Sequence, residues 1–311
     1  MASKPRSPLH LQLLCTLSPA PTPPPTLLPP LLPLSSHPLP RPPPPLRSTL
    51  LPSSVLAGNI FLQGSITQLA LPTSLRVLDL AWTSVTGSVP SAILSLPALS
   101  HLDVYMTTIS GSLPSTLGRL TGLKYLNIGA ENITGRVEDL SWISSLTNLH
   151  SLVMYGMYRV EGDLSTLTFL TALTAMQSLT IARVPWAGEL PALLGTLTAL
   201  THLDVSGLLT TVFPRWSLDL TNLRFLDAAH YAKLRTGVMP QDLSRLAHLE
   251  HFDASGNGPS GALPDYWTSL KHLTYLCASC VVPAATSCSF SSLTILLTLL
   301  ATSCLILLFV I

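Results

Sequence analysis

The sequence is poor in charged and in aromatic residues. Asp, Glu, Lys and Arg make up 10% of the 311 residues, Phe, Trp and Tyr make up 6%, and the formal net charge is +1. Proteins that bind nucleic acid hold its phosphates with a clustered basic surface. This chain has too few positive charges for such a surface, so we do not expect nucleic acid as a partner.

Motifs for catalysis are also missing. The sequence contains no glycine-rich phosphate loop, no nucleophile elbow, no H-E-x-x-H zinc motif and no kinase segment. We therefore expect a protein that is not an enzyme and that uses neither a cofactor nor a metal ion.

What the sequence does contain is a regular repeat. Nine segments of the form L-x-x-L-x-L follow one another, and their nearly constant spacing is typical of a solenoid, in which stacked units share one core. They begin at Leu75, Leu99, Leu123, Leu149, Met176, Leu200, Leu223, Leu249 and Leu273. We expect residues 51–280 to form an α/β solenoid of about nine repeats, a leucine-rich repeat horseshoe with a parallel β-sheet on its concave face.

A motif that ends several units adds to this pattern. The sequence G-x-[apolar]-P occurs at residues 87–90, 111–114, 188–191 and 261–264. Together with the leucines, it resembles the plant-type extracellular leucine-rich repeat of receptor-like proteins, receptor kinase ectodomains and polygalacturonase-inhibiting proteins. The resemblance implies a fold that binds a ligand and signals only through a partner, such as a co-receptor kinase.

We number each repeat from the first leucine of its L-x-x-L-x-L segment, which is position one. The sequence departs from this family at position nine of the repeat. The family carries a ladder of asparagines there, whereas this chain has Thr83, Thr107, Glu131, Val184 and Leu208, and keeps Asn257. Since the turns still contain backbone groups that need hydrogen bonds, we expect threonine hydroxyls or water to replace the asparagines, with a loss of stability.

Candidate binding residues lie where side chains of neighbouring strands stack into columns on the concave face. Exposed Trp and Tyr favour interfaces because they offer a large contact area at low entropic cost. The predicted ligand-binding residues are Trp82, Tyr105, Tyr125, Tyr155, His101 and Asp103. The alternative is that the aromatic rings only pack on one another or shield strand edges.

The pattern His-x-Asp occurs three times in these columns, at residues 101–103, 202–204 and 251–253. Side chains two residues apart on a strand share a face, so each pair could contact a metal ion. No third ligand is evident beside any pair, and aspartate at this position is common in the repeat family. We therefore predict no metal site.

Two kinds of covalent modification are suggested by the sequence. Asn132 begins an N-x-[ST] sequon and is a candidate for glycosylation if the chain is secreted. Cys277, Cys280 and Cys288 follow the last repeat, where a disulfide could close the array in an oxidising compartment. Three cysteines leave the pairing open, and a C-x-x-C metal or redox site is the weaker alternative.

Both ends of the chain differ from the repeats. Residues 1–20 combine two basic residues with a leucine-rich run, as in a secretory signal, and an organelle transit peptide is the alternative. Residues 21–50 are proline-rich and predict a disordered spacer. After a polar spacer at residues 281–292, the uncharged residues 293–311 predict either a transmembrane helix or a GPI-anchor signal.

These features predict a non-catalytic leucine-rich repeat protein of the cell surface, attached to the plasma membrane through its C-terminal tail. It would be receptor-like and would recognise a protein, peptide or glycan ligand on its concave face. A GPI-anchored structural or adhesive surface protein is the first alternative. An inhibitor-type binder of secreted enzymes is the second, and targeting to an organelle is the alternative location.

Overall fold

A computed structural model of the chain describes residues 53–55, 57–68, 71–89, 91–210, 213–231, 242–255, 257 and 270–277. All of these residues belong to one compact unit, Pro44–Ile311. The predicted segments 1–20, 21–50, 281–292 and 293–311 lie outside the described residues, as do Cys280 and Cys288. Within the described ranges, no helix has the length and apolar composition that crossing a bilayer requires.

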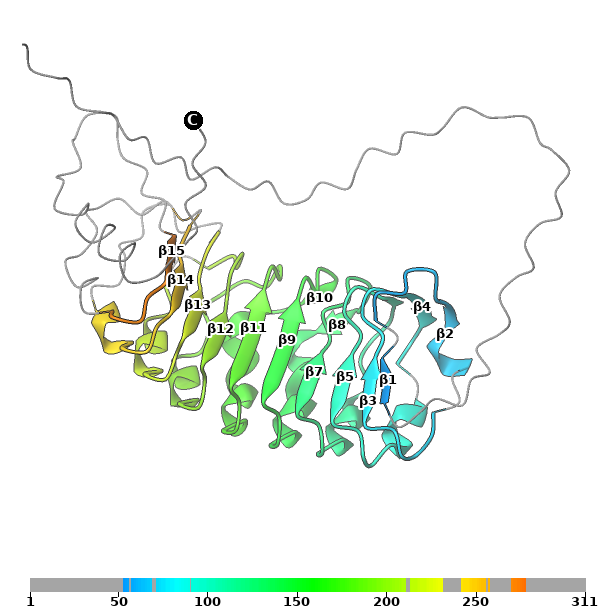
Figure 1. Ribbon diagram of the computed structural model, residues 1–311. Coiled ribbons are helices and arrows are strands. Elements are labelled where there is room, and N and C mark those ends of the chain that lie inside the picture. The colour runs from blue at the N-terminus through cyan, green and yellow to red at the C-terminus, as the bar shows by residue number, and fades with distance from the viewer. Residues whose placement is uncertain are drawn as a thin grey trace, which may run out of the picture. The chain divides into compact units, whose positions relative to one another are not determined.

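Ten short strands form one parallel sheet, which we call the main sheet (Figure 1). The strands are β1 (Ser53–Val55), β3 (Val77–Asp79), β5 (His101–Asp103), β7 (Tyr125–Asn127), β9 (Ser151–Tyr155), β11 (Ser178–Ala182), β12 (His202–Asp204), β13 (Phe225–Asp227), β14 (His251–Asp253) and β15 (Tyr275–Cys277). From β3 onward, each strand begins two residues after one of the predicted repeat starts. The predicted solenoid of parallel strands is therefore confirmed.

The core follows from the register of these strands. Leu78 pairs with Leu102, and Leu102 pairs with Leu126, so that equivalent leucines of successive repeats lie side by side. This column continues to Phe252, which is fully buried. Because each buried side chain packs between its counterparts in the repeats before and after, one continuous core runs through the described part of the solenoid.

Smaller elements cover the flank and the side of the core opposite the main sheet. The flank strands are β2 (Gln63–Ser65), β4 (Ser84–Gly87) and β6 (Thr108–Ile109) in one sheet, and β8 (Gly135–Arg136) and β10 (Val160–Glu161) in another. The helices are η1 (Ile66–Gln68), η2 (Ser91–Ser95), η3 (Ser115–Arg119), η4 (Val137–Ser145), η5 (Leu164–Ala172), η6 (Ala192–Thr196), η7 (Arg215–Asp219) and η8 (Leu243–Arg245).

All of these helices are 3-10 helices, whereas the predicted α/β class implies α-helices. The prediction was wrong on this point. Most of the segments have three to five residues, which allows the i to i+3 hydrogen bonds of a 3-10 helix but is too short for a regular α-helix. Only η4 and η5 have nine residues each.

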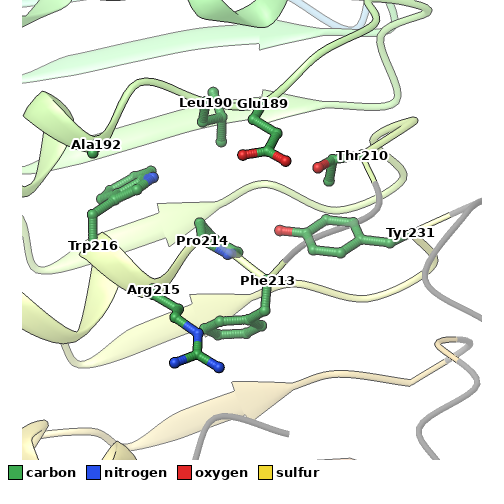
Figure 2. A pocket seen from close by; sticks show the side chains of 9 residues that line it. All are labelled: Glu189, Leu190, Ala192, Thr210, Phe213, Pro214, Arg215, Trp216 and Tyr231. Atoms are coloured by element: carbon green, nitrogen blue, oxygen red, sulfur yellow. The ribbon is translucent and has the colours of Figure 1, made fainter. Parts of the chain in front are cut away.

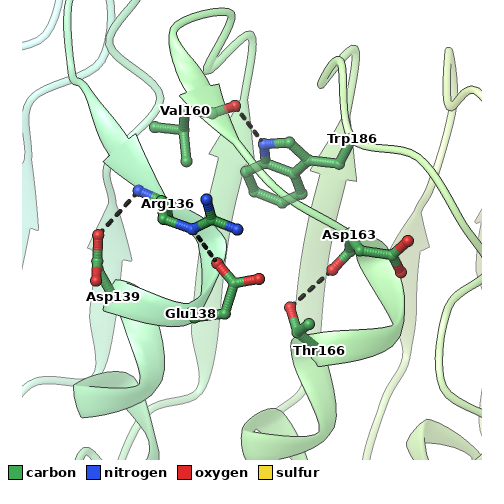
Figure 3. Close-up of polar contacts among 7 residues, drawn as sticks. All are labelled: Arg136, Glu138, Asp139, Val160, Asp163, Thr166 and Trp186. Carbon is green, nitrogen blue, oxygen red and sulfur yellow. Dashed lines mark hydrogen bonds and ion pairs between the residues drawn. The ribbon is translucent and has the colours of Figure 1, made fainter.

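On the flank of the central repeats, polar side chains form hydrogen bonds with backbone carbonyls (Figure 3). The indole nitrogen of Trp186 donates a 2.8 Å hydrogen bond to the carbonyl of Val160, and the Thr166 hydroxyl donates one of 2.7 Å to the carbonyl of Asp163. Asp163 also forms an isolated parallel bridge with Ala187. In the described residues, this bridge is the last pairing along the flank.

Contacts within the chain also fix the start of helix η4, as Figure 3 shows. The backbone nitrogen of Arg136 donates a 3.0 Å hydrogen bond to the carboxylate of Asp139, and its guanidinium lies 3.2 Å from the carboxylate of Glu138. The first bond supplies a partner for a backbone group that the helix itself leaves unpaired. The second contact is exposed and therefore adds little stability.

Candidate ligand-binding face

The turns after six strands of the main sheet, β3, β5, β7, β12, β13 and β14, are stabilised by the side chain at position five of the repeat. In the second repeat, the carboxylate of Asp103 accepts a 2.8 Å hydrogen bond from the backbone nitrogen of Tyr105. Equivalent bonds join Asp79 to Ala81, Asn127 to Gly129, Asp204 to Ser206, Asp227 to Ala229 and Asp253 to Ser255. The aspartates of the His-x-Asp pairs are thus turn acceptors. Among the described residues, no three metal-binding side chains lie together.

Side chains at position nine of the repeat also form hydrogen bonds with backbone groups of these turns, from the side of the core. The hydroxyls of Thr83 and Thr107 donate 2.7 Å and 2.8 Å hydrogen bonds to the carbonyls of Leu80 and Val104. Asn257, in contrast, contacts the preceding repeat through two hydrogen bonds. At these two turns, threonine hydroxyls replace the missing asparagines as expected, but each one bonds only within its own repeat.

Position eight has a left-handed backbone in most repeats. Gly58, Gly156 and Gly207 have φ values between 66° and 76° there. Four residues adopt the same conformation without being glycine: Trp82 with a φ of 59°, Met106 with 52°, Arg183 with 51° and His230 with 58°. A left-handed backbone costs such residues about 1–2 kcal/mol each. The side chains of Trp82, Arg183 and His230 are exposed, and half of the Trp82 surface is accessible.

Trp82, Tyr105, Tyr155 and Arg183 together form what we call the aromatic strip. The rings of Trp82 and Tyr105 meet edge to face with centroids 5.6 Å apart, and those of Tyr105 and Tyr155 do so at 5.9 Å. The guanidinium carbon of Arg183 lies 5.7 Å from the centre of the Tyr155 ring. Edge-to-face rings and a cation over a ring face are both attractive arrangements. The strip therefore extends across the repeats that contain β3 to β11.

Gly129 makes the aromatic strip continuous. Tyr105 and Tyr155 belong to the second and fourth repeats, and Gly129 occupies the same position seven in the repeat between them. A Cβ atom at Gly129 would lie 2.7 Å from the carbonyl oxygen of Tyr155 and 3.1 Å from Cδ2 of Tyr105. Because glycine has no side chain, the two tyrosine rings can meet over it.

We expect Gly129→Ala to separate these rings and to lower the free energy of unfolding by about 1–3 kcal/mol, since the carbonyl oxygen of Tyr155 has to move. Near-ultraviolet circular dichroism and thermal unfolding would measure both effects. Gly122→Ala is the matched control, because its Cβ would lie 3.5 Å from the nearest carbonyl, an ordinary contact. Equal effects of the two substitutions would contradict this role of Gly129.

A second set of rings, which we call the ring column, stands at position three of the repeats. His101 stacks face to face on Tyr125 with ring centres 4.1 Å apart. Neighbouring parallel strands are about 4.8 Å apart, which suits flat stacking of rings in register. Ser151 and Ser178 separate the two parts of the column. In the second part, ring centres lie 3.9–4.2 Å apart in the row His202, Phe225, His251 and Tyr275.

Asp103 holds the tyrosines around it in place. Its carboxylate accepts hydrogen bonds of 3.1 Å from the Tyr125 hydroxyl and 3.2 Å from the Asn127 amide, besides the bond from Tyr105. Burial raises the pKa of Asp103, and burial followed by the Asp103 charge raises the pKa of Tyr125 to about 12. Asp103 is 7% exposed, so it positions Tyr125 rather than offering a free carboxylate to a ligand.

The structure brings the predicted residues Trp82, Tyr105 and Tyr155 into contact, which is the mutual packing that the sequence analysis named as the alternative, and their role in ligand binding stays a prediction. Tyr158 is half exposed, and nothing in the sequence analysis selected it, although its repeat is longer than the others. Asn132 lies half-buried in the loop before β8, and its glycosylation stays a prediction. Cys277 ends β15, while the predicted disulfide involves residues outside the described part of the chain.

Comparisons with known proteins agree on the fold. No family model and no curated protein matches the sequence. The structure of a TDR receptor is 28% identical in sequence and matches over 72% of this chain and 38% of its own, with a TM-score of 0.60. The Arabidopsis receptor kinase HAESA, in complex with the peptide hormone IDA and the co-receptor SERK1, is 22% identical over 74% of this chain and 48% of its own, with a TM-score of 0.52.

A bacterial protein has the same fold. A leucine-rich repeat protein from Leptospira interrogans is 21% identical over 68% of this chain and 57% of its own, with a TM-score of 0.51. The chain thus spans less than two thirds of the length of each of these structures. The likenesses to HAESA and to the bacterial protein establish only the fold, whereas the higher identity with the TDR receptor agrees with the plant-type repeat motif.

Proposed function

Since this chain is a leucine-rich repeat protein of the plant extracellular type, we propose that it is a receptor-like binding protein without catalytic activity. Its ligand is a protein or peptide, bound on the exposed face of the main sheet. The first contact surface is the aromatic strip, and the ring column borders it.

The observation that carries this proposal is the exposed Trp82 at the end of the strip. A tryptophan at this place costs backbone strain, whereas glycine occupies the same position in three other described repeats without that cost. Half of its surface faces solvent although it is one of the most apolar side chains. Aromatic residues in this state are the typical anchors of protein interfaces.

The location and partners form the remaining part of the proposal. We place the chain at the cell surface, secreted by residues 1–20 and attached by residues 293–311, with Asn132 as a glycosylation site. HAESA binds the peptide hormone IDA together with the co-receptor SERK1. By analogy, this chain would bind its ligand together with a co-receptor kinase, which would supply the signalling step.

The test removes the strip side chains without disturbing the turns. Trp82→Gly combined with Tyr105→Ala should abolish capture of secreted peptides and proteins by the immobilised full chain, measured by mass spectrometry of the eluate. Glycine suits the left-handed backbone at residue 82, so the melting temperature should change by only a few degrees. Phe61→Ala is the control, because Phe61 is a highly exposed aromatic residue that precedes the flank strand β2. Capture that survives in the double variant, or that is lost equally in the control, would refute the proposal.

A further inference from the structure

A cavity of about 250 Å³ lies on the flank beyond the last flank pairing, between the repeats that contain β11, β12 and β13 (Figure 2). Its wall is largely aromatic and prolyl, from Phe213, Pro214, Trp216 and Tyr231. Glu189 and Arg215 stand at its rim and are exposed. The volume far exceeds that of a single water molecule, which takes about 30 Å³ in the liquid.

The repeat that supplies Phe213, Pro214, Arg215 and Trp216 to the cavity wall departs from the pattern of the others. Three residues after the motif proline, other repeats bury Ile93, Leu117 or Leu194, whereas this repeat buries Ser217. A serine in place of a leucine removes core volume at this point. The preceding residue, Trp216, is buried, whereas its counterpart Leu193 is exposed. Trp216 thus partly fills the space that the missing leucine leaves.

A glycine in the previous repeat allows the chain at Trp216 to approach closely. A Cβ atom on Gly195 would lie 3.1 Å from the carbonyl oxygen of Trp216 and 3.4 Å from its Cβ. The same arrangement occurs three repeats earlier, where Gly118 faces Trp142 on helix η4. The Trp142 indole nitrogen is also buried without a partner in the described residues, but Trp142 does not line the cavity. Trp142 is therefore a matched control for substitutions of Trp216.

Two buried polar atoms of the cavity wall have no hydrogen-bond partner within the described part of the chain. They are the hydroxyl of Tyr231 and the indole nitrogen of Trp216, in residues that are only 2% and 8% exposed. Figure 2 shows both groups and the carboxylate of Glu189 directed toward the space between them. A buried donor without a partner destabilises the fold. Another buried tryptophan of this chain does have a partner, because the indole nitrogen of Trp186 donates to the carbonyl of Val160.

Tyr231 occupies this place because it replaces the ladder asparagine at position nine of its repeat. Its backbone nitrogen donates to the side-chain oxygen of Asn257 at 2.7 Å, which fixes the residue in the turn. Burial raises the pKa of Tyr231 well above its ordinary value, so the phenol keeps its proton. The groups around the cavity are therefore a hydroxyl that can donate or accept, an indole that can only donate, a carboxylate that only accepts and, in Arg215, a guanidinium that only donates. The hydroxyl and the indole nitrogen are covered in this structure, so a ligand pairs with them only when the Tyr231 and Trp216 side chains shift.

We propose that this cavity binds a small neutral polyhydroxyl molecule of the size of a single sugar ring. A hydroxyl can accept from the indole of Trp216 and donate to the carboxylate of Glu189, and the C–H faces of such a ring pack on aromatic and prolyl surfaces. The rim carries one charge of each sign, the carboxylate of Glu189 and the guanidinium of Arg215, so neither a cation nor an anion is favoured. The mixed donors and acceptors thus favour a neutral ligand, and this site is separate from the aromatic strip.

The test uses the full chain and saturation-transfer NMR with D-glucose, D-galactose and D-xylose as separate probes at millimolar concentration. We expect saturation transfer to at least one of these sugars. Tyr231→Phe removes only the hydroxyl and should weaken binding about tenfold, the effect of one hydrogen bond. It should fold at least as stably as the parent chain, because it removes an unpaired polar group.

Trp216→Phe should weaken binding to a similar extent, whereas Trp142→Phe should leave it unchanged. The Trp82→Gly and Tyr105→Ala variant should also keep full sugar binding, which separates this proposal from the proposed function. Two results would overturn the inference: no saturation transfer from the folded chain to any of the three sugars, which would mean that the cavity holds only water, or equal binding by the parent chain and Tyr231→Phe.

Discussion

Replacing Asn257 with alanine should lower the free energy of unfolding by about 2–5 kcal/mol, because two buried backbone groups would lose their partners and each unpaired group costs about 1–3 kcal/mol. The Asn257 side chain is 4% exposed. Its oxygen accepts from the backbone nitrogen of Tyr231 at 2.7 Å, and its nitrogen donates to the carbonyl of Ala228 at 2.7 Å. Denaturant unfolding measures the total effect.

Hydrogen exchange locates that effect within the molecule. The amide of Tyr231 should lose most of its protection in Asn257→Ala, because its acceptor is gone, while amides in β3 to β7 keep theirs. A stacked array loses stability locally when one interface is weakened. Asn222→Ala is the control, since Asn222 is an exposed asparagine that makes one 2.9 Å bond to the carbonyl of Thr198. If both variants lost the same stability, Asn257 would have no special role.

Asp227→Asn should stabilise the chain at pH 8, on the order of 3 kcal/mol, and leave it nearly unchanged at pH 4. Burial raises the pKa of Asp227 to about 7, and the charges of Asp204 and Asp253 on the adjacent strands act in the same direction. The shift is the net result, because the Ala229 N–H bond and the Arg183 charge oppose it. One pKa unit corresponds to about 1.4 kcal/mol, and solvent screening of the partly exposed carboxylate reduces the full amount.

The sign follows from proton linkage. Between about pH 4 and pH 7, the folded chain keeps the proton on Asp227 while the unfolded chain, with a pKa near 3.8, has released it. Stability therefore falls as the pH rises through this window and stays level above it. Asparagine carries no titrating proton, so the slope contributed by residue 227 should disappear from the pH dependence of the melting temperature.

Asparagine is also compatible with the turn, because Asn127 at the same position of another repeat accepts from the nitrogen of Gly129 at 3.1 Å. Asp227→Ala separates the two roles of the side chain: it removes the charge and also the acceptor of the Ala229 nitrogen, so its gain at pH 8 should be smaller. Superimposable pH profiles for the parent chain and Asp227→Asn would show that folding does not shift the pKa of Asp227.

The periodic part of this molecule follows from its sequence. The spacing of Leu75, Leu99 and Leu123 sets where β3, β5 and β7 begin, because a strand alternates its side chains and a repeat must bury the same positions each time. The same alternation predicted the exposed face for Tyr105 at position seven, and the turn position eight predicted it for Trp82. Even the replacement of ladder asparagines by threonines was predictable, since backbone groups in turns need a partner.

The contacts between repeats required the tertiary structure. Nothing local to Gly129 indicates that Tyr105 and Tyr155 meet above it, because these tyrosines are distant in the sequence and approach only through the stacking of the repeats. Asp103 was predicted as an exposed contact, yet it is buried because its short side chain reaches back to the turn. The unpaired groups that face the cavity come from two different repeats. Sequence periodicity determined which face each side chain occupies, and packing between repeats decided which side chains touch.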